Sequence, residues 1–427
     1  MPRLGAFAAG EKLKRHMSDS DRIFDKLHRR VVVAALGVTQ IFAWGSTFYL
    51  LGVLGHPIAL DTGWSYELVI SGVSVGLLMA GIISPRIGRA IGNNGGKPIL
   101  ALSAILLALG LASLGFSQSI VWYLAAWLLV GVGMGSGLTD AAFATLGSIY
   151  GKGARSAITS LTLFAGFAST ICWPLSFYLV EHLGWREACF TYAAIQIGVA
   201  LPILLLALPN RSFAAPFTDH IGTSEIASLA PGELGLFAIL AAVVTLSASI
   251  FSMLGVHLLP VLQARGLELS AAVGLGAIVG PSQVVARVVE MLGGRHYHPV
   301  WTMVASTVLV AIGIGMLFSD FPAYSAAIAL YGAGNGIGSV ARGTLPLALF
   351  GPSRYPALMG RLARPILMSM AVSPFAGAIA FQVGGANLLL GLLALVGALN
   401  VLLVGLLWIL SRGRPTQSRP QGSAHGK

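Results

Sequence analysis

The feature that most constrains the fold is a series of long apolar runs separated by short polar connections. The hydrocarbon core of a bilayer is about 30 Å thick, so a helix needs roughly 20 apolar residues to cross it. Only 10% of the 427 residues are charged and the mean hydropathy is +0.83, which excludes an ordinary soluble domain. We therefore predict an all-α membrane protein with twelve transmembrane helices. The predicted spans are 31–54, 67–86, 98–117, 119–148, 156–180, 188–209, 233–257, 270–291, 299–319, 323–350, 364–383 and 387–411.

The distribution of Lys and Arg predicts how these helices are oriented. If the chain starts in the cytoplasm, 23 of its 26 Lys and Arg fall on the inner side, Arg186 and Arg265 fall outside, and Arg342 lies within a helix. Cytoplasmic loops are enriched in these residues, so we expect both termini in the cytoplasm and a multi-pass protein in a bacterial inner membrane. The formal charge of +11 is then a topology signal and indicates no nucleic-acid partner.

The chain is expected to consist of two halves on either side of its longest polar stretch between spans. An internal repeat supports this division, because four glycines in the fourth span reappear 201 residues later in the tenth. The pairs are Gly131 and Gly332, Gly133 and Gly334, Gly135 and Gly336, and Gly137 and Gly338. Parallel repeats are typical of transporters that rock about a central site. The predicted parts are a basic cytoplasmic tail (1–30), a six-helix bundle (31–209), a cytoplasmic loop (210–232), a second six-helix bundle (233–411) and a disordered cytoplasmic tail (412–427).

A short motif at the end of the second span carries a family resemblance. Gly81, Arg86, Gly88 and Arg89 lie in the sequence GIISPRIGR. This segment resembles the glycine, acid, arginine, glycine, arginine signature between helices two and three of the major facilitator superfamily, with Pro85 where the family usually has an aspartate. Through the spans and the repeat, the resemblance extends over the whole chain. It implies two pseudo-symmetric six-helix bundles and transport by alternating access.

Shorter matches resemble two groups within that superfamily. The monocarboxylate and oxalate/formate branch is resembled by Gly63-Trp64-Ser65, Tyr150, Arg155, Gly184-Trp185-Arg186, and Gln283 with Arg287. The second half, with YHPVWTM and LPLALFGPSRYPALMGR, is similar in overall texture to bacterial exporters of trivalent metalloids such as arsenite. Gly166 with Trp173 and Pro174 retains part of the superfamily's exporter motif, so the resemblance favours export.

Charged residues near the inner membrane surface are candidates for a gate. An ionised side chain at the bilayer centre costs about 2.5–3.5 kcal/mol on insertion scales, so each one in a span is a functional candidate. The offset of 201 relates Arg86 to Arg287 and Arg89 to Glu290. We predict two inner ion pairs, Arg89 with Asp140 and Glu290 with Arg342. Their alternative role is to anchor helix ends and set topology.

Arg287 has two interpretations. The resemblance makes it a ligand for an anionic substrate. Its depth, near the inner edge of the eighth span, makes it a second gate residue or an arginine that contacts lipid headgroups. Both interpretations stay open.

The substrate site is expected near the membrane midplane between the halves. The candidate substrate-binding residues are Gln40, Trp44, Trp127, Cys172, Ser249, Gln283, Arg287, Tyr331 and Asn335. The amides among them need hydrogen-bond partners when buried. No Asp, Glu, Lys or His lies at the midplane, so the usual carboxylate proton carrier is missing there, and a site of amides, hydroxyls and indoles suits a neutral or partly anionic solute.

These features predict a secondary transporter rather than an enzyme, with no cofactor and no metal site, and with a proton gradient as a candidate driving force. The favoured function is export of a small polar solute, with a trivalent metalloid such as arsenite or antimonite as the first substrate and Cys172 as a soft ligand. The alternative is a small organic anion or another small metabolite bound by Arg287, and the remote alternative is a passive channel. The expected partners are a small-molecule substrate and the lipid bilayer, and we expect a monomer.

Overall fold

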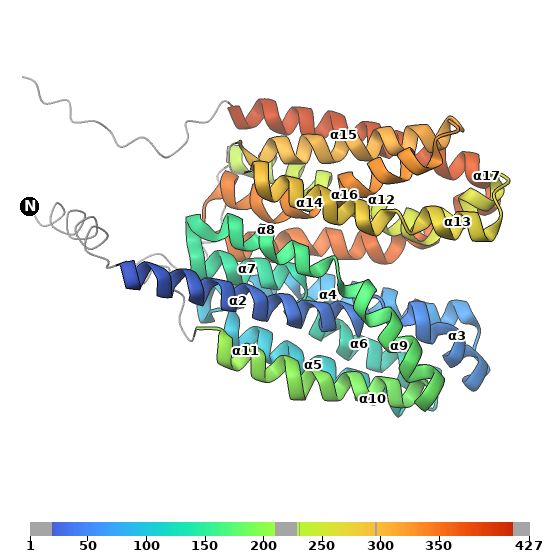
Figure 1. Ribbon diagram of the computed structural model, residues 1–427, viewed down its shortest axis with the longest axis horizontal. Coiled ribbons are helices and arrows are strands. Elements are labelled where there is room, and N and C mark those ends of the chain that lie inside the picture. The colour runs from blue at the N-terminus through green and yellow to red at the C-terminus, as the bar shows by residue number, and fades with distance from the viewer. Residues whose placement is uncertain (1–18, 210–228, 230, 295–296, 413–427) are drawn as a thin grey trace, which may run out of the picture.

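The fold is described by a computed structural model over residues 19–209, 229, 231–294 and 297–412. Most of the predicted tails and of the loop over 210–232 lie outside these described residues. All regular secondary structure within them is helical (Figure 1). The helices are α2 (Asp19–Gly45), α3 (Leu51–Thr62), α4 (Tyr66–Asn94), α5 (Gly96–Gly115), α6 (Ile120–Gly137), α7 (Thr139–Tyr150), α8 (Ala154–Ala165), α9 (Ala168–Leu183), α10 (Trp185–Ile195), α11 (Leu201–Ala207), α12 (Pro231–Ala264), α13 (Leu269–Gly276), α14 (Val279–Gly293), α15 (Pro299–Phe318), α16 (Tyr324–Phe350) and α17 (Tyr355–Arg412), with short 3₁₀ and π turns η1 (Gly151–Gly153) and η2 (Gln196–Ala200).

The apolar helices fit a membrane protein. Eight helical stretches of the described residues are long and apolar enough to cross a bilayer. The helix α17 contains the last two predicted spans, and only Gly384 and Gly385 between them are non-helical. The number of twelve transmembrane helices stays a prediction.

Four of the predicted spans are interrupted, so the expectation of one continuous helix over each was wrong. The span 31–54 is divided by a turn at 46–50, the span 119–148 at Leu138, the span 156–180 at Gly166 and Phe167, and the span 270–291 at Ala277 and Ile278. A helix break frees backbone polar groups, which membrane proteins tolerate only inside the protein or beside a water-filled cavity. The breaks therefore indicate where a site is built.

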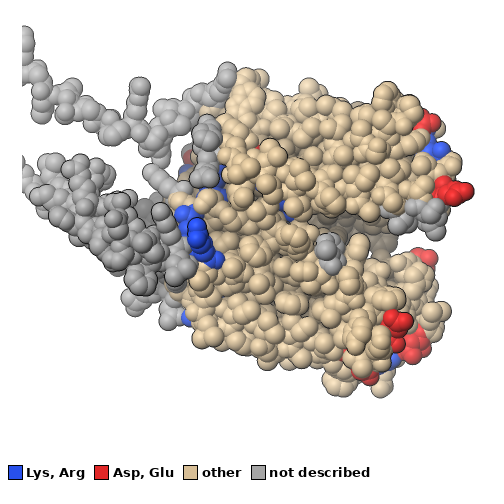
Figure 2. All heavy atoms as spheres, in the orientation of Figure 1, with Lys and Arg blue, Asp and Glu red and all other residues tan. Residues whose placement is uncertain are grey.

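The helices form two groups that lie side by side, α2 to α11 and α12 to α17 (Figure 1). We call them the first and second groups. Both Asp19 and Arg412 lie at one end of the molecule, which we call the terminal end, whereas α3 and α13 lie at the opposite, far end. On the face shown in Figure 2, Lys and Arg gather toward the terminal end and Asp and Glu toward the far end.

Matching hydrogen bonds confirm that the two groups repeat one packing pattern. The hydroxyl of Ser103 donates to the carbonyl of Gly133 at 2.8 Å, and the hydroxyl of Ser306 donates to the carbonyl of Gly334 at 2.7 Å. Gly334 follows Gly133 by 201 residues, as the glycine pattern predicts. Ser306 follows Ser103 by 203 residues, so the offset is not the same for every helix.

The same larger offset applies to the pairing of α4 with α14. Gly135 packs against the backbone of Ala80, and Gly336 packs in the same way against the backbone of Gln283. Close backbone approach of this kind needs glycine, because any side chain would occupy the neighbouring helix's space. Gln283 follows Ala80 by 203 residues.

The predicted correspondence of Arg86 with Arg287 and of Arg89 with Glu290 is therefore wrong by two residues. At an offset of 203 the counterpart of Arg287 is Ser84, a buried residue of α4. The charges of α14 have evolved on positions where the first half carries none.

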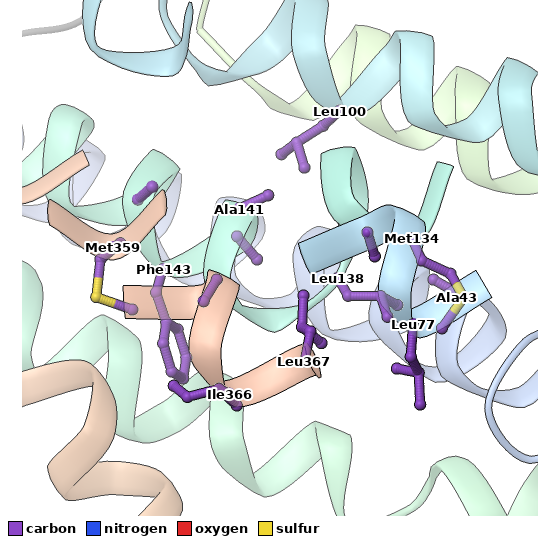
Figure 3. Packing of buried hydrophobic residues seen from close by; sticks show 14 of the residues in the cluster. Ala43, Leu77, Leu100, Met134, Leu138, Ala141, Phe143, Met359, Ile366 and Leu367 are labelled. Atoms are coloured by element: carbon purple, nitrogen blue, oxygen red, sulfur yellow. The ribbon is translucent and has the colours of Figure 1, made fainter. Parts of the chain in front are cut away.

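The molecule is closed at the terminal end and open at the far end. One large apolar core includes residues of both groups, and Figure 3 shows Met359, Ile366 and Leu367 of α17 among Leu138 and Phe143 of the first group. A second apolar core, around Leu254 and Leu389, lies wholly in the second group. Figure 2 shows a hollow between the groups that opens at the far end.

Ion pairs at the far end agree with this arrangement. Arg186 pairs with Asp61 inside the first group, and Arg265 pairs with Asp320 at 3.5 Å inside the second group. The side-chain hydrogen bonds of Arg186 and Trp185 lower the pKa of the Asp61 carboxyl. Each far-end charge pair among the described residues thus stays within one group, as expected for two bodies that separate there.

Candidate functional site

Arg287 lies on α14 where the two groups meet, and only 7% of it is exposed. Its Nη1 donates to the carbonyl of Thr162 in the first group at 3.0 Å, and its Nε donates to the carbonyl of Gly336 at 3.2 Å. Its Nη2 donates to Oε1 of Gln283 at 3.2 Å. These bonds use three of the five N–H donors of the guanidinium.

The break after α8 prepares the contact between the groups. In a continuous helix the N–H of Gly166 would donate to Thr162, but here it donates to the carbonyl of Leu163 at 3.2 Å. The carbonyl of Thr162 is thereby available to Arg287. An ideal Cβ on Gly166 would lie 2.9 Å from Nη1 of Arg287, so the absence of a side chain there makes room for the guanidinium.

The charge of Arg287 has no acidic partner in the described part of the chain. The four ion pairs found there involve other arginines, and the oxygens around Arg287 are neutral. A buried charge is stabilised when it is paired, and a lone one marks a functional site in a membrane protein. Chemically, this position can bind an anion.

An aromatic cluster of the first group lies beside this arginine. It consists of Trp44, Phe48, Tyr49 and Trp173, with ring centroids 5.3–6.2 Å apart. Tyr49 is close enough to Arg287 to interact with it electrostatically. Trp44 also donates to the hydroxyl of Thr139 at 2.9 Å, which joins the break after α2 to the break before α7. Sequence reasoning named Trp44 but missed Tyr49, because a turn inside the first span was not expected.

Three predicted residues of the second group come together. Gln283 bonds Arg287, and the glycine that packs on the backbone of Gln283 directly follows Asn335. Nδ2 of Asn335 is buried without a hydrogen-bond acceptor among the described residues, and Tyr331, which is 3% exposed, lies one helical turn away. Their binding of a substrate stays a prediction.

Three other predicted substrate contacts lie inside the first group instead. Trp127 is fully buried against Gly72 and Gly76 of α4. Gln40 donates to the carbonyl of Gly137 at 2.6 Å, and it lines a small internal cavity of about 10 Å³ together with residues of α5, α6 and η2.

Cys172 is also enclosed. Its thiol packs against Gly45 and faces the carbonyl of Ile41 at 3.6 Å, and none of its surface is exposed. These predictions failed for one reason: depth in the membrane was known from the sequence, but the direction of each side chain was not.

Ser249 lies within the second group. Its hydroxyl bonds to that of Ser369 and donates to the carbonyl of Thr245 at 3.0 Å. It therefore links α12 to α17, and its contact with a substrate stays a prediction.

The predicted ion pair of Arg89 with Asp140 is not formed. Asp140 of α7 instead pairs with Arg342 of α16, across the boundary between the groups. Arg89 is exposed and turned away from α7, because the neighbouring Gly88 faces α17. A small cavity of about 10 Å³ lies between the Asp140–Arg342 pair and Trp44.

The predicted ion pair of Glu290 with Arg342 is not formed either. Oε1 of Glu290 accepts from the hydroxyl of Thr302 at 2.8 Å, and Oε2 accepts from the hydroxyl of Tyr297. Burial and this bond to Glu290 raise the pKa of Tyr297 to about 12, so the phenol keeps the proton that it donates. Glu290 faces α15, whereas Arg342 faces the first group.

Arg155 is a gate residue that sequence reasoning noted only as part of a resemblance. It begins α8 in the first group and donates to the carbonyls of Gly294 and Tyr297 in the second, the latter at 3.0 Å. Because Tyr297 in turn donates to Glu290, a continuous polar chain crosses the terminal end. A lone arginine before a predicted span was the available signal, but its carbonyl partners have none.

Two repeated helical groups, apolar spans, and broken helices around a buried arginine define a multi-pass membrane protein of the transporter class. The Major Facilitator Superfamily's sequence profile matches residues 36–296. Since this is more than half of the chain, the protein belongs to that superfamily.

Individual relatives are distant. The chain is 25% identical over 128 residues to the niacin transporter NiaP of Acinetobacter baylyi, covering 30% of this chain and 28% of that protein. It is 26% identical over 200 residues to the multidrug resistance protein MdtL of Shewanella oneidensis, covering 45% and 48%. The matches thus span less than half the length of these curated relatives.

Solved structures share the fold. The human organic anion transporter MFSD10 (TETRAN) matches with a TM-score of 0.68 and 18% identity, over 88% of this chain and 99% of that one. A double tryptophan mutant of XylE matches with a TM-score of 0.68 and 15% identity, over 89% and 95%. FucP, in the outward conformation, matches with a TM-score of 0.67 and 13% identity, over 89% and 99%.

Proposed function

We propose that the protein is a secondary transporter of a small organic anion, and that Arg287 binds the anionic group. The observation that carries this proposal is the buried guanidinium of Arg287, whose described partners are all neutral oxygens. A carboxylate fits a guanidinium through two parallel charge-assisted hydrogen bonds. Arg287 has two N–H donors beyond its three described bonds, which is the number that such a pair needs.

The neighbours of Arg287 suit a small ligand with an apolar body. Tyr49 and Trp173 meet edge to face at 5.9 Å, and 48% of the surface of Trp173 is exposed. Aromatic side chains of this kind supply apolar contact area. Gln283 and Asn335 supply amide groups on the facing side.

The same contacts give Arg287 its second role. Because its bond to Thr162 joins the two groups, an anion that draws the guanidinium away would also weaken closure of the terminal end. Substrate binding and opening would then compete for one side chain. The two sequence-based interpretations of Arg287 are thus combined in this proposal.

Nothing in the site favours a trivalent metalloid in the same way. The thiol of Cys172, its proposed soft ligand, is enclosed within the first group. Export, the cytoplasmic location of both termini and the bacterial inner membrane remain our expectations on the motifs and the charge distribution. If a proton gradient drives transport, the partly buried Asp140 is the acid between the groups that can carry the proton.

The experiment is counterflow of small carboxylates into proteoliposomes, with arsenite as a parallel substrate. Replacement of Arg287 by Gln should abolish carboxylate counterflow, and Arg287→Lys should keep part of it because the charge remains. Arg265→Lys is the matched control, since that arginine lies at the far end with Asp320. Unchanged carboxylate affinity in Arg287→Gln would overturn the proposal, as would saturable arsenite transport without any carboxylate transport.

A further inference from the structure

Four arginines lie on one side of the helix crossing that joins the two groups. The crossing is formed by α4 and the first part of α17, whose backbones touch at Gly88 and Gly360: an ideal Cβ on Gly88 would lie 2.8 Å from Cα of Gly360. Gly81 faces the carbonyl of Arg364 in the same way, at 3.1 Å. Because residue numbers rise along α4 as they fall along α17, the two helices are antiparallel.

The positions of the arginines follow from this contact line. A residue turns by about 100° around an α-helix relative to its neighbour. Arg89 and Arg361 each follow a contact glycine by one residue, so each is rotated by about 100° in the sense of its own helix. In an antiparallel pair, these two rotations lead to the same side. Arg86 and Arg364 lie at about 160° and 40° on that side, and all four side chains are exposed.

That side of the crossing faces lipid. Toward the far end, the same side presents Ile82 of α4 and Val372 of α17, which are 46% and 55% exposed. The arginines lie at the terminal edge of this apolar surface, within roughly 10 Å along the helix axes by their spacing. This depth is where a membrane's headgroups meet its hydrocarbon.

The local charge is uncompensated by acids of the two helices. The single acid of α4, Glu67, is in its first turn at the far end, and α17 contains no Asp or Glu. Arg86, Arg89 and Arg364 take part in none of the ion pairs of the described residues. Basic clusters between membrane helices recognise anionic lipid headgroups.

We propose that these four arginines bind the phosphate of an anionic phospholipid, which bridges the two groups at their terminal end. Arg86 and Arg89 hold it from the first group, and Arg361 and Arg364 hold it from the second. Since opening of the terminal end separates α4 from this part of α17, the bound lipid favours the closed arrangement. The site is distinct from Arg287, which lies between α8, α14 and α16.

The test compares phosphatidylglycerol binding by the full chain and its variants. Native mass spectrometry from lipid nanodiscs that mix phosphatidylglycerol with phosphatidylcholine should retain phosphatidylglycerol on the wild type. The variants Arg86→Gln with Arg89→Gln, and Arg361→Gln with Arg364→Gln, should each weaken retention about tenfold or more, as expected for the loss of two charges near the surface. Replacement of all four by Lys should keep most of it and guards against misfolding.

Two controls decide the outcome. Arg30→Gln removes an exposed terminal-end charge from α2, away from the crossing, and should leave retention unchanged. Equal retention by the Gln variants and the wild type would overturn the proposal. So would a wild-type protein that inorganic phosphate stabilises against heat as well as phosphatidylglycerol does, because the cluster would then take a free anion rather than a lipid.

Discussion

Among the described residues, Asp140 and Arg342 form the one ion pair between the two groups. Their side chains are 13% and 20% exposed, so water screens the pair only in part. Loss of one partner leaves the other buried without compensation, for which about 1–3 kcal/mol is a fair expectation at this depth. The pair is therefore a quantitative test of the gate.

We expect Asp140→Asn to shift the equilibrium toward opening of the terminal end by about tenfold, which corresponds to ~1.4 kcal/mol. The measurement is the alkylation rate of a cysteine placed at Phe143, which is fully buried beneath the closed end. The exchange Asp140→Arg with Arg342→Asp should restore slow alkylation. Glu233→Gln, whose partner Arg354 lies in the same group, is the matched control, and failure of the exchange to rescue would refute the gate.

The sequence predicted Asp140 and Arg342 as gate residues, but with the wrong partners. A repeat relates positions within each half and says nothing about which faces of the halves meet. Arg89 precedes no contact with α7, because Gly88 directs the neighbouring face of α4 toward α17. Glu290 was misassigned because one offset was applied to all helices, whereas α4 and α14 differ by two residues from α6 and α16.

At the scale of the element, α15 begins with a cap that depends on pH. Nδ1 of His298 accepts from the N–H of Val300 at 3.2 Å, which requires that nitrogen to be unprotonated. Loss of water around the ring, and secondly the charge of Arg155, lower the pKa of His298. The stability that this cap contributes is complete above the ordinary pKa of about 6.5 and is lost as pH falls through the lower folded value.

We expect acidification below pH ~6.5 to reduce the thermal stability of the wild type more than that of His298→Asn. Asparagine also caps helices but does not titrate, and a cap contributes about 1 kcal/mol. The measurement is thermal unfolding of the purified protein at a series of pH values. Parallel pH curves for the two proteins would show that His298 is not the group responsible.

Element positions were predicted better than element continuity. The apolar runs located the helices, because length and hydropathy are properties of the sequence alone. The breaks in four spans were missed, although a glycine lies at or next to the breaks at Leu138, Gly166 and Ala277. With 54 glycines in the chain, that signal could not be separated from glycines that serve helix packing.

At the scale of the whole molecule, the shared apolar core makes the terminal end the closed one, so alternating access predicts opposite movements at the two ends. Spin labels at Leu60 and Phe321, both exposed at the far end, should approach each other when a transported substrate binds. Labels at Arg30 and Leu410 should move apart. Double electron–electron resonance measures both distances.

The two cysteines of the chain, Cys172 and Cys189, are buried and should not interfere with labelling. Changes of the same sign at both ends, or none at either, would contradict a rocking movement. The fold class and the repeat could be predicted from sequence because they rest on patterns along the chain. The site could be predicted only in part, since it depends on contacts between residues more than a hundred positions apart.

The changing offset between the halves also has a use in protein engineering. Leu107 packs against Gly133, and its counterpart Val310 packs against Gly334, yet the connection between these contacts is two residues longer in the first half. The same packing therefore tolerates two chain lengths at the far end. Residues 116–119, which join α5 to α6, are thus a permissive place for a deletion or an inserted epitope that leaves the helices below undisturbed.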